Sequence, residues 1–290
     1  MSGSSNYQKL RPYNLFMGLF HLIQGILMVI LSNDTTTTIS IWLPEANFEN
    51  IEEASRGAII PMAQELVEIN FGLLISTFLF ASALAHFLTV LPGIYNWYLR
   101  NLKREINLIR WYEYAVSSSI MVIVIGYLCN IRDATIFGLL FMLNFAMNLF
   151  GSSMELHNAD LKEKTVQYNA ARELVAKTKR QKLPVAEYQP NWHHFVYGCI
   201  AGSVPWIVFT IYFVYSLEQI GDRVEIPSFV YTVLYVLFVF FNLFAINMAL
   251  QYKRVWKWKS YLFGEYVYIF LSLAAKSALA WIIWGGTLRG

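Results

Sequence analysis

The sequence predicts an all-α membrane protein with seven transmembrane helices in one domain, residues 1–290. Only 14% of the residues are charged and 57% are hydrophobic, whereas a soluble domain carries about 25% charged residues. A helix needs about 20 mostly apolar residues to cross the bilayer. The spanning segments must be helical, because unpaired backbone groups are too costly in lipid. Seven stretches meet that length: 13–32, 67–92, 106–130, 134–154, 194–216, 227–250 and 261–284.

The distribution of Lys and Arg predicts how these helices are oriented. Connections on the cytoplasmic side of a membrane are enriched in both residues. The connections of one side hold most of the cations, and those of the other side hold only Arg56, Arg132, Arg223 and Arg289. We therefore predict a cytoplasmic N-terminus and an extracellular C-terminus, in a multi-pass protein of the plasma membrane. The predicted cytoplasmic cations are Lys9, Arg11, Arg100, Lys103, Arg104, Arg110, Lys162, Lys164, Arg172, Lys177, Lys179, Arg180, Lys182, Lys253, Arg254, Lys257 and Lys259.

Two of the predicted connections are long. Residues 33–66 are rich in Thr and then acidic, and we expect them outside, partly as a hairpin around Ile39–Leu43. Residues 155–193 are expected inside, with Asp160–Lys182 as a charged surface helix.

Lys276 is the most informative residue, because ionisable side chains at membrane depth are costly and usually functional. It lies about 15 residues into the seventh predicted span, roughly 22 Å from its start at ~1.5 Å per residue. From that depth its amine cannot reach the cytoplasmic surface. One interpretation is a structural salt bridge to a carboxylate. The other is a desolvated amine that condenses with an aldehyde.

Glu113 is the expected partner of Lys276. It is the only carboxylate of the third predicted span, and side chains lean toward the N-terminus of their helix, which brings the two groups to similar depth. A protonated imine needs a counter-ion in a medium of low dielectric constant. Ser272, one turn before Lys276, can accept from the imine or orient Glu113. The alternative for Glu113 is an interfacial glutamate that faces lipid headgroups.

Further polar residues lie in the same half of the predicted bundle as Glu113. We predict that they form a water-filled proton network, although buried histidines can also be ordinary core residues. The candidates are His21, Gln24, Ser82, His86, Asn144 and Asn148.

Carboxylates elsewhere suggest no second proton site. Glu265 is close to the start of the seventh helix, where the macrodipole stabilises a negative charge, and we favour that role over a proton path. The outer half of the third span is apolar, and Glu68 at the mouth of the second span is the nearest acid.

A binding pocket for a polyene must have apolar and aromatic walls. We expect these from the third, fifth and sixth spans. The candidates for the pocket are Tyr114, Ser117, Ser118, Met121, Asn144, Trp206, Phe240, Phe241 and Phe244.

Five motifs, in this order and together, resemble those of the heliorhodopsins and extend over nearly all of the helical core. They are Ser82-Ala-Leu-Ala-His86, Arg110-Trp111-Tyr112-Glu113-Tyr114, Ser117-Ser118-Ser119, Asn247-Met248-Ala-Leu-Gln251-Tyr252 and Ser272-Leu-Ala-Ala-Lys276-Ser277-Ala-Leu-Ala-Trp281. The orientation predicted from charge is also that of this family. The long basic 155–193 connection and the acidic first loop depart from the family's pattern.

The resemblance implies all-trans retinal on Lys276, Glu113 as counter-ion and Ser272 beside the imine. It also implies a cytoplasmic-side cavity with His21 and His86, and a homodimer. Heliorhodopsins generally act as slow light sensors without pumping, while a few are thought to pass protons. Three functions therefore remain: a photosensor with an unidentified cytoplasmic signalling partner, a light-driven or light-gated proton conductor, and a retinal-free receptor or enzyme. The buried amine disfavours the third, and nothing suggests binding of nucleic acid.

Overall fold

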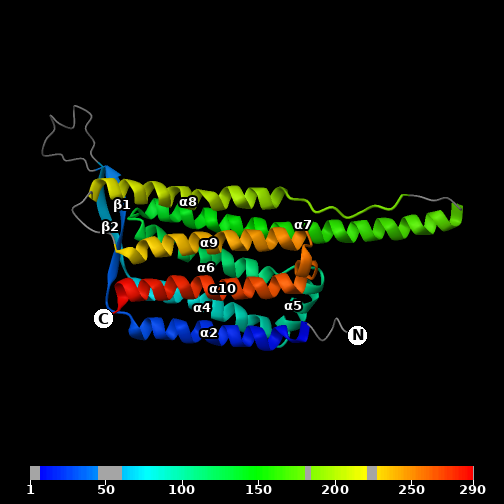
Figure 1. Ribbon diagram of the computed structural model, residues 1–290, viewed down its shortest axis with the longest axis horizontal. Helices are drawn as coiled ribbons and strands as arrows, with labels where there is room; N and C mark the ends of the chain where they lie inside the picture. The colour runs from blue at the N-terminus through cyan, green and yellow to red at the C-terminus, as the bar shows by residue number, and fades with distance from the viewer. Residues whose placement is uncertain (1–6, 45–60, 180–183, 221–226, 290) are drawn as a thin grey trace, which may run out of the picture.

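The computed structural model describes residues 7–44, 61–179, 184–220 and 227–289. Seven of its helices are long and apolar enough to cross a membrane, and they run side by side along one axis (Figure 1). The start of the first and the end of the last lie at opposite ends of the bundle, as an odd number of spans requires. These helices are α2 (Leu10–Leu31), α4 (Phe71–Val90), α6 (Leu108–Leu128), α7 (Ala134–Lys179), α8 (His193–Ile220), α9 (Ser228–Tyr252) and α10 (Tyr261–Ile283).

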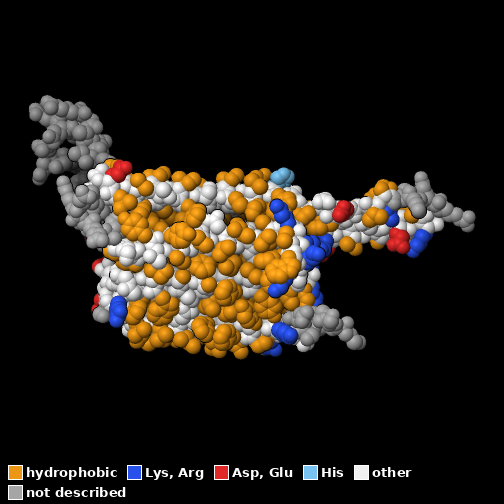
Figure 2. Space-filling view, in the orientation of Figure 1, with side chains coloured by type: hydrophobic (Ala, Val, Ile, Leu, Met, Phe, Trp, Pro, Cys, Tyr) orange, Lys and Arg blue, Asp and Glu red, His pale blue; other side chains and the backbone are white. Residues whose placement is uncertain are grey.

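Neighbouring helices pack in chain order from α2 to α8, and α9 packs on α10. Because α10 also contacts α2 and α4, the last spanning helix packs back onto the first two. The surface in Figure 2 shows a broad hydrophobic belt over the bundle, with Lys and Arg gathered mainly at the end from which α7 projects. This distribution is that of a protein whose middle lies in the hydrocarbon of a bilayer.

A β-hairpin covers the end of the bundle where α10 finishes, here called the hairpin end. Strand β1 (Thr36–Pro44) pairs antiparallel with β2 (Pro61–Asn70), with an irregularity between Ile39 and Ser40. The run of Thr and Ile residues favours a strand because β-branched side chains suit the pleated surface. The predicted hairpin is confirmed.

The predicted start of the second span is wrong. Residues 67–70 belong to β2, and α4 begins at Phe71 because the Asn70 side chain accepts a hydrogen bond from the Leu73 amide at 2.9 Å, a typical N-cap. Glu68 consequently lies on the strand, where Thr36 donates to it, and not at the mouth of a span.

Helix α7 is continuous for 46 residues and projects far beyond the other helices (Figure 1). We call residues 156–179 the arm, and the end of the bundle that carries it the arm end. The predicted charged surface helix at Asp160–Lys182 is helical as far as Lys179, and its residues 180–182 lie outside the described part of the chain. It continues the fourth span without a break, because neither Gly nor Pro interrupts the helix after Gly151. The chain returns along the arm, where the Asn169 side chain hydrogen-bonds both backbone groups of Ala186 at 2.8 and 2.9 Å.

Two short helices at the arm end were not predicted. Helix α5 (Ile94–Lys103) crosses the bundle axis (Figure 1) and begins after Gly93, whose φ of 88° favours glycine. Its Tyr98 and Leu102 are buried against the start of α10, and burial raises the pKa of Tyr98 to about 12. The second is a 3₁₀ turn, η2 (Trp256–Lys259), which joins α9 to α10. At the opposite, hairpin end, a π-helical turn, η3 (Trp284–Leu288), follows α10.

Candidate functional site

The buried amine of Lys276 lies at the centre of a group of polar side chains from three helices. Its Nζ is 2.6 Å from Oε1 of Glu113 on α6, 2.5 Å from Oγ of Ser82 on α4 and 3.0 Å from Oγ of Ser272 on its own helix. Ser82 also donates to Glu113 at 2.7 Å. An ammonium has three donors, and these three oxygens match them. Lys276 is only 3% exposed, so an unpaired charge here would be strongly unfavourable.

A second group of polar residues lies on the arm-end side of this ion pair. The rings of His21 and His86 stack with centroids 5.6 Å apart, and Nδ1 of His86 is 2.8 Å from Oδ1 of Asn14. A cavity of about 30 Å³ is lined by Asn14, His86 and Glu113 among others, which is enough for one or two water molecules. His21 is completely buried, and neither ring nitrogen has a hydrogen-bond partner among the described residues.

Gln24 takes a different position from the one expected. Its Oε1 accepts a hydrogen bond from the indole of Trp281 at 2.8 Å, so it fastens α2 to α10. Asn14 was not singled out from the sequence. It lies two helical turns before His21 on the same face of α2, and that spacing was the signal for it.

Arg110 forms a second buried ion cluster, still closer to the arm end. Its guanidinium is paired with Glu155 of α7 and Glu265 of α10. Asn107 completes the cluster, because its backbone amide donates to Glu155 and its side chain to Glu265, both at 2.8 Å. The three charged side chains are at most 5% exposed.

This cluster corrects two predictions. Arg110 is not a loop cation, because the first turn of α6 directs it inward, where its guanidinium lies 4.0 Å from the ring centroid of Tyr268. Glu265 lies near the start of α10, but Arg110 and not the macrodipole is its main partner. Glu155 was missed entirely. The polar face of α7, formed by Asn144, Asn148, Glu155 and Asn158 at helical spacing, was the signal that indicated it.

A cavity of about 670 Å³ opens from Lys276 between α6, α7, α8 and α9. Helices α8 and α9 face each other across it, and its walls are mostly apolar. Trp206 packs edge-to-face on Phe238 and Phe241, with ring centroids 5.2 and 5.4 Å apart. The predicted residues that line the cavity are Tyr114, Ser117, Ser118, Met121, Trp206, Phe241, Phe244, Ser272 and Lys276.

Two predicted wall residues do not line the cavity. Phe240 packs against the hydrophobic core, and Phe238, two residues earlier on α9, lines the cavity in its place. The side chain of Asn144 lies behind the wall, where it donates to Ser118 at 2.7 Å and Ser119 at 3.0 Å. In both cases the residue type was right for the region, but the facing direction depended on how the helix is rotated.

The wall residue Tyr114 connects the cavity with the amine. Its hydroxyl donates to the backbone oxygen of Tyr268 at 2.9 Å, and Nζ of Lys276 lies 5.4 Å from its ring centroid. The amine thus has an aromatic cavity on one side and a carboxylate on the other. This arrangement fits an elongated apolar aldehyde, which needs an amine to attach and an anion to balance the resulting charge.

The sequence model of the Heliorhodopsin family matches residues 10–288. The chain belongs to the heliorhodopsin family. The match covers every spanning helix, so the chain is a multi-pass membrane protein of a rhodopsin family, for which retinal is the chromophore and light sensing the function. No curated protein matches this heliorhodopsin.

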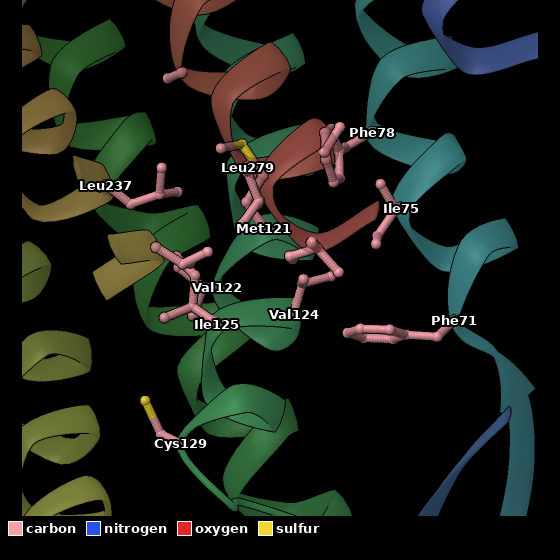
Figure 3. Close-up of a cluster of buried hydrophobic side chains, with 14 of the residues drawn as sticks. Phe71, Ile75, Phe78, Met121, Val122, Val124, Ile125, Cys129, Leu237 and Leu279 are labelled. Carbon is pink, nitrogen blue, oxygen red and sulfur yellow. The ribbon is translucent and has the colours of Figure 1, made fainter. Parts of the chain in front are cut away.

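Towards the hairpin end, this heliorhodopsin has a hydrophobic core. Figure 3 shows side chains from α4, α6, α9 and α10 that fill the space beside the last turns of α10. Most of this cluster is completely excluded from solvent, including Ile75, Leu79, Val124, Ile125 and Leu279. Polar groups around Lys276 therefore lie mainly on its arm-end side.

Proposed function

We propose that this heliorhodopsin is a light sensor with all-trans retinal bound to Lys276 as a Schiff base and Glu113 as its counter-ion. The observation that carries the proposal is the position of the Lys276 amine, between the Glu113 carboxylate and the aromatic cavity. Retinal supplies light absorption and photoisomerisation.

Three side chains of this heliorhodopsin have distinct roles in the proposal. Glu113 balances the positive charge on the Lys276 nitrogen, which is needed in an environment of low dielectric constant. Ser82 bridges the two, since its hydroxyl contacts both the amine and the carboxylate. Ser272, one turn before Lys276 on α10, accepts a hydrogen bond from the same nitrogen at 3.0 Å.

Among the residues that the structure describes, a proton released from the Lys276 nitrogen has nearby acceptors in one direction only. Glu113, His86 and the water-sized cavity lie toward the arm end, whereas hydrophobic side chains fill the hairpin half (Figure 3). Active transport needs proton sites on both sides of the nitrogen. We therefore propose a slow photocycle without pumping, in which the proton returns by the route it left.

A proton conductance is the second candidate function. The water-sized cavity between His86, Asn14 and Glu113 favours it, because protons move readily through such groups. Arg110 also lines this cavity and stands between it and the arm end. Arg110 is paired there with Glu155 and Glu265, and hydrophobic side chains fill the hairpin half of the described bundle. Because these polar groups lead to one side of the bundle only, we rank conductance below sensing.

We propose further that the arm end faces the cytoplasm of a plasma membrane and that the protein is a homodimer. The excess of Lys and Arg on connections at the arm end supports this orientation. The arm then projects into the cytoplasm, where its exposed side chains, such as Val166 and Leu174, are accessible to a signalling partner.

The decisive experiment is expression of Lys276→Ala in the presence of all-trans retinal. The wild type and the matched exposed variant Lys164→Ala should be coloured, and Lys276→Ala should be colourless. Addition of a preformed Schiff base of retinal with a small alkylamine should restore the colour of Lys276→Ala, because the cavity persists. A Lys276→Ala protein that is as coloured as the wild type with retinal alone would disprove the attachment.

A further inference from the structure

In the turn between α9 and α10, a tryptophan side chain is exposed on the surface and its backbone has an unfavourable conformation. Trp256 is 70% exposed and its neighbour Val255 is 43% exposed. Trp256 and Arg254 have φ values of 46° and 51°, in the left-handed region that is unfavourable for bulky residues. Such strain persists only where the surrounding structure fixes it, and it often marks a functional site.

Three contacts fix this turn. The indole of Trp258 donates to Asn247 at 2.6 Å and packs edge-to-face on Phe263 with centroids 4.9 Å apart. Arg254 is 3.6 Å from Glu105, just after α5. The turn is therefore anchored on both sides, and the exposure of Trp256 is a property of the fold.

One cation lies against the exposed ring, and further exposed cations lie on the same turn and on helix α5. Nζ of Lys257 lies 4.6 Å from the centroid of Trp256, and Lys253 and Lys259 are exposed on the same turn. Helix α5 adds Arg100 and Lys103, which are also exposed. The two elements are adjacent because Tyr98 and Leu102 of α5 pack with Tyr261 and Leu262 of α10. We call Arg100, Lys103, Lys253, Trp256, Lys257 and Lys259 the basic rim.

The positive charge of the basic rim is not balanced within the described part of the chain. None of its five cations has an ion pair there, because the nearby carboxylates already have other partners. Glu105 pairs with Lys162 and Arg254, and Asp160 and Glu163 pair with Arg104. The basic rim therefore needs negative charge from outside the chain.

We propose that the basic rim is a binding site for anionic phospholipid, in which its cations bind the phosphate headgroups and Trp256 lies at their level. The rim borders the bilayer, since Figure 2 shows Lys and Arg at the arm end where the hydrophobic belt stops. Tryptophan is enriched at this depth, and clusters of four or more cations beside a spanning helix attract anionic lipids. A soluble acidic partner would bind from the aqueous side, whereas a lipid places its headgroup beside the cations and its acyl chains beside the exposed ring of Trp256.

The test measures lipid selectivity of the full-length protein, reconstituted in phosphatidylcholine bilayers. A trace of spin-labelled phosphatidylglycerol or phosphatidylcholine reports, by electron paramagnetic resonance, the fraction of each lipid held at the protein surface. We expect the wild type to retain phosphatidylglycerol in preference, and 1 M NaCl to weaken the preference because it screens charges beyond roughly 3 Å. In Lys253→Gln/Lys257→Gln/Lys259→Gln the preference should fall by about fivefold or more, as each cation near the surface contributes substantially.

The matched control is Lys164→Gln/Lys177→Gln/Lys179→Gln, which removes the same charge from the arm, away from the bilayer. It should keep the wild-type preference. Equal retention of both lipids by the wild type would overturn the proposal without any variant, and so would an equal loss of preference in both variants. The outcome does not depend on retinal, because colour and lipid retention are read separately.

Discussion

The side chains of Lys276 and Glu113 form an ion pair of 2.6 Å between α10 and α6, and both are almost completely excluded from solvent. Neither charge is stable alone at this depth, so each requires the other. Lys276 reaches Glu113 because helical side chains lean toward the N-terminus of their helix. The pair therefore joins the two helices at the point where the aromatic cavity begins.

Replacement of Glu113 by Gln should shift the visible absorption maximum to the red and leave less of the chromophore protonated at neutral pH. The reason is that the positive charge on the Lys276 nitrogen loses the anion that stabilises it in the ground state. Absorption spectra across a pH titration measure both effects, with Glu163→Gln on the exposed arm as control. Spectra of Glu113→Gln that overlay the wild type would assign the counter-ion to another group, with Glu265 the next candidate.

Replacement of Arg110 by Gln should destabilise the protein by about 3–5 kcal/mol, because it leaves the buried carboxylates of Glu155 and Glu265 without a cation. Arg104→Gln should cost at most about 1 kcal/mol, since Arg104 pairs with Glu163 on the surface. Chemical unfolding followed by circular dichroism gives both values. Equal stability of the two variants would mean that the buried cluster contributes little to the fold.

Tags at the two ends of the chain test the proposed orientation. An epitope at Met1 should bind antibody only after the cells are permeabilised, whereas one at Gly290 should bind on intact cells. The charge asymmetry between the connections is the reason. The reverse labelling pattern would place the arm outside the cell and exclude a cytoplasmic partner for it.

Illumination of cells that express the protein with retinal should produce no current against an opposing proton gradient. Hydrophobic side chains fill the hairpin half, so a proton has no exit in that direction. Any current that does flow should reverse near the proton equilibrium potential and decrease in Glu113→Gln and His86→Ala. A current that persists against the gradient would reveal a pump, with Glu68 the first residue to replace.

Several structural features could be read from the sequence because bilayer physics constrains them strongly. The seven spans follow from the length of the apolar runs, and the hairpin follows from the β-branched residues near Ile39. The proximity of Lys276 and Glu113 follows from their depth and from the cost of an unpaired charge in lipid. The structure places Nζ of Lys276 2.6 Å from Oε1 of Glu113, and the roles of both residues toward retinal remain predictions.

The sequence by itself determined how many helices cross the membrane and that Lys276 and Glu113 lie inside it, because both depend on transfer of residues from water to lipid. Only the tertiary structure decided what those helices present to one another. Arg110 was assigned to a loop by its neighbours in sequence, but the rotation of α6 directs it to Glu155 and Glu265. In the same way, the rotation of α9 about its own axis placed Phe238, and not Phe240, in the cavity wall. Hydropathy fixes the depth of a residue, whereas the direction of its side chain depends on the packing of the surrounding helices.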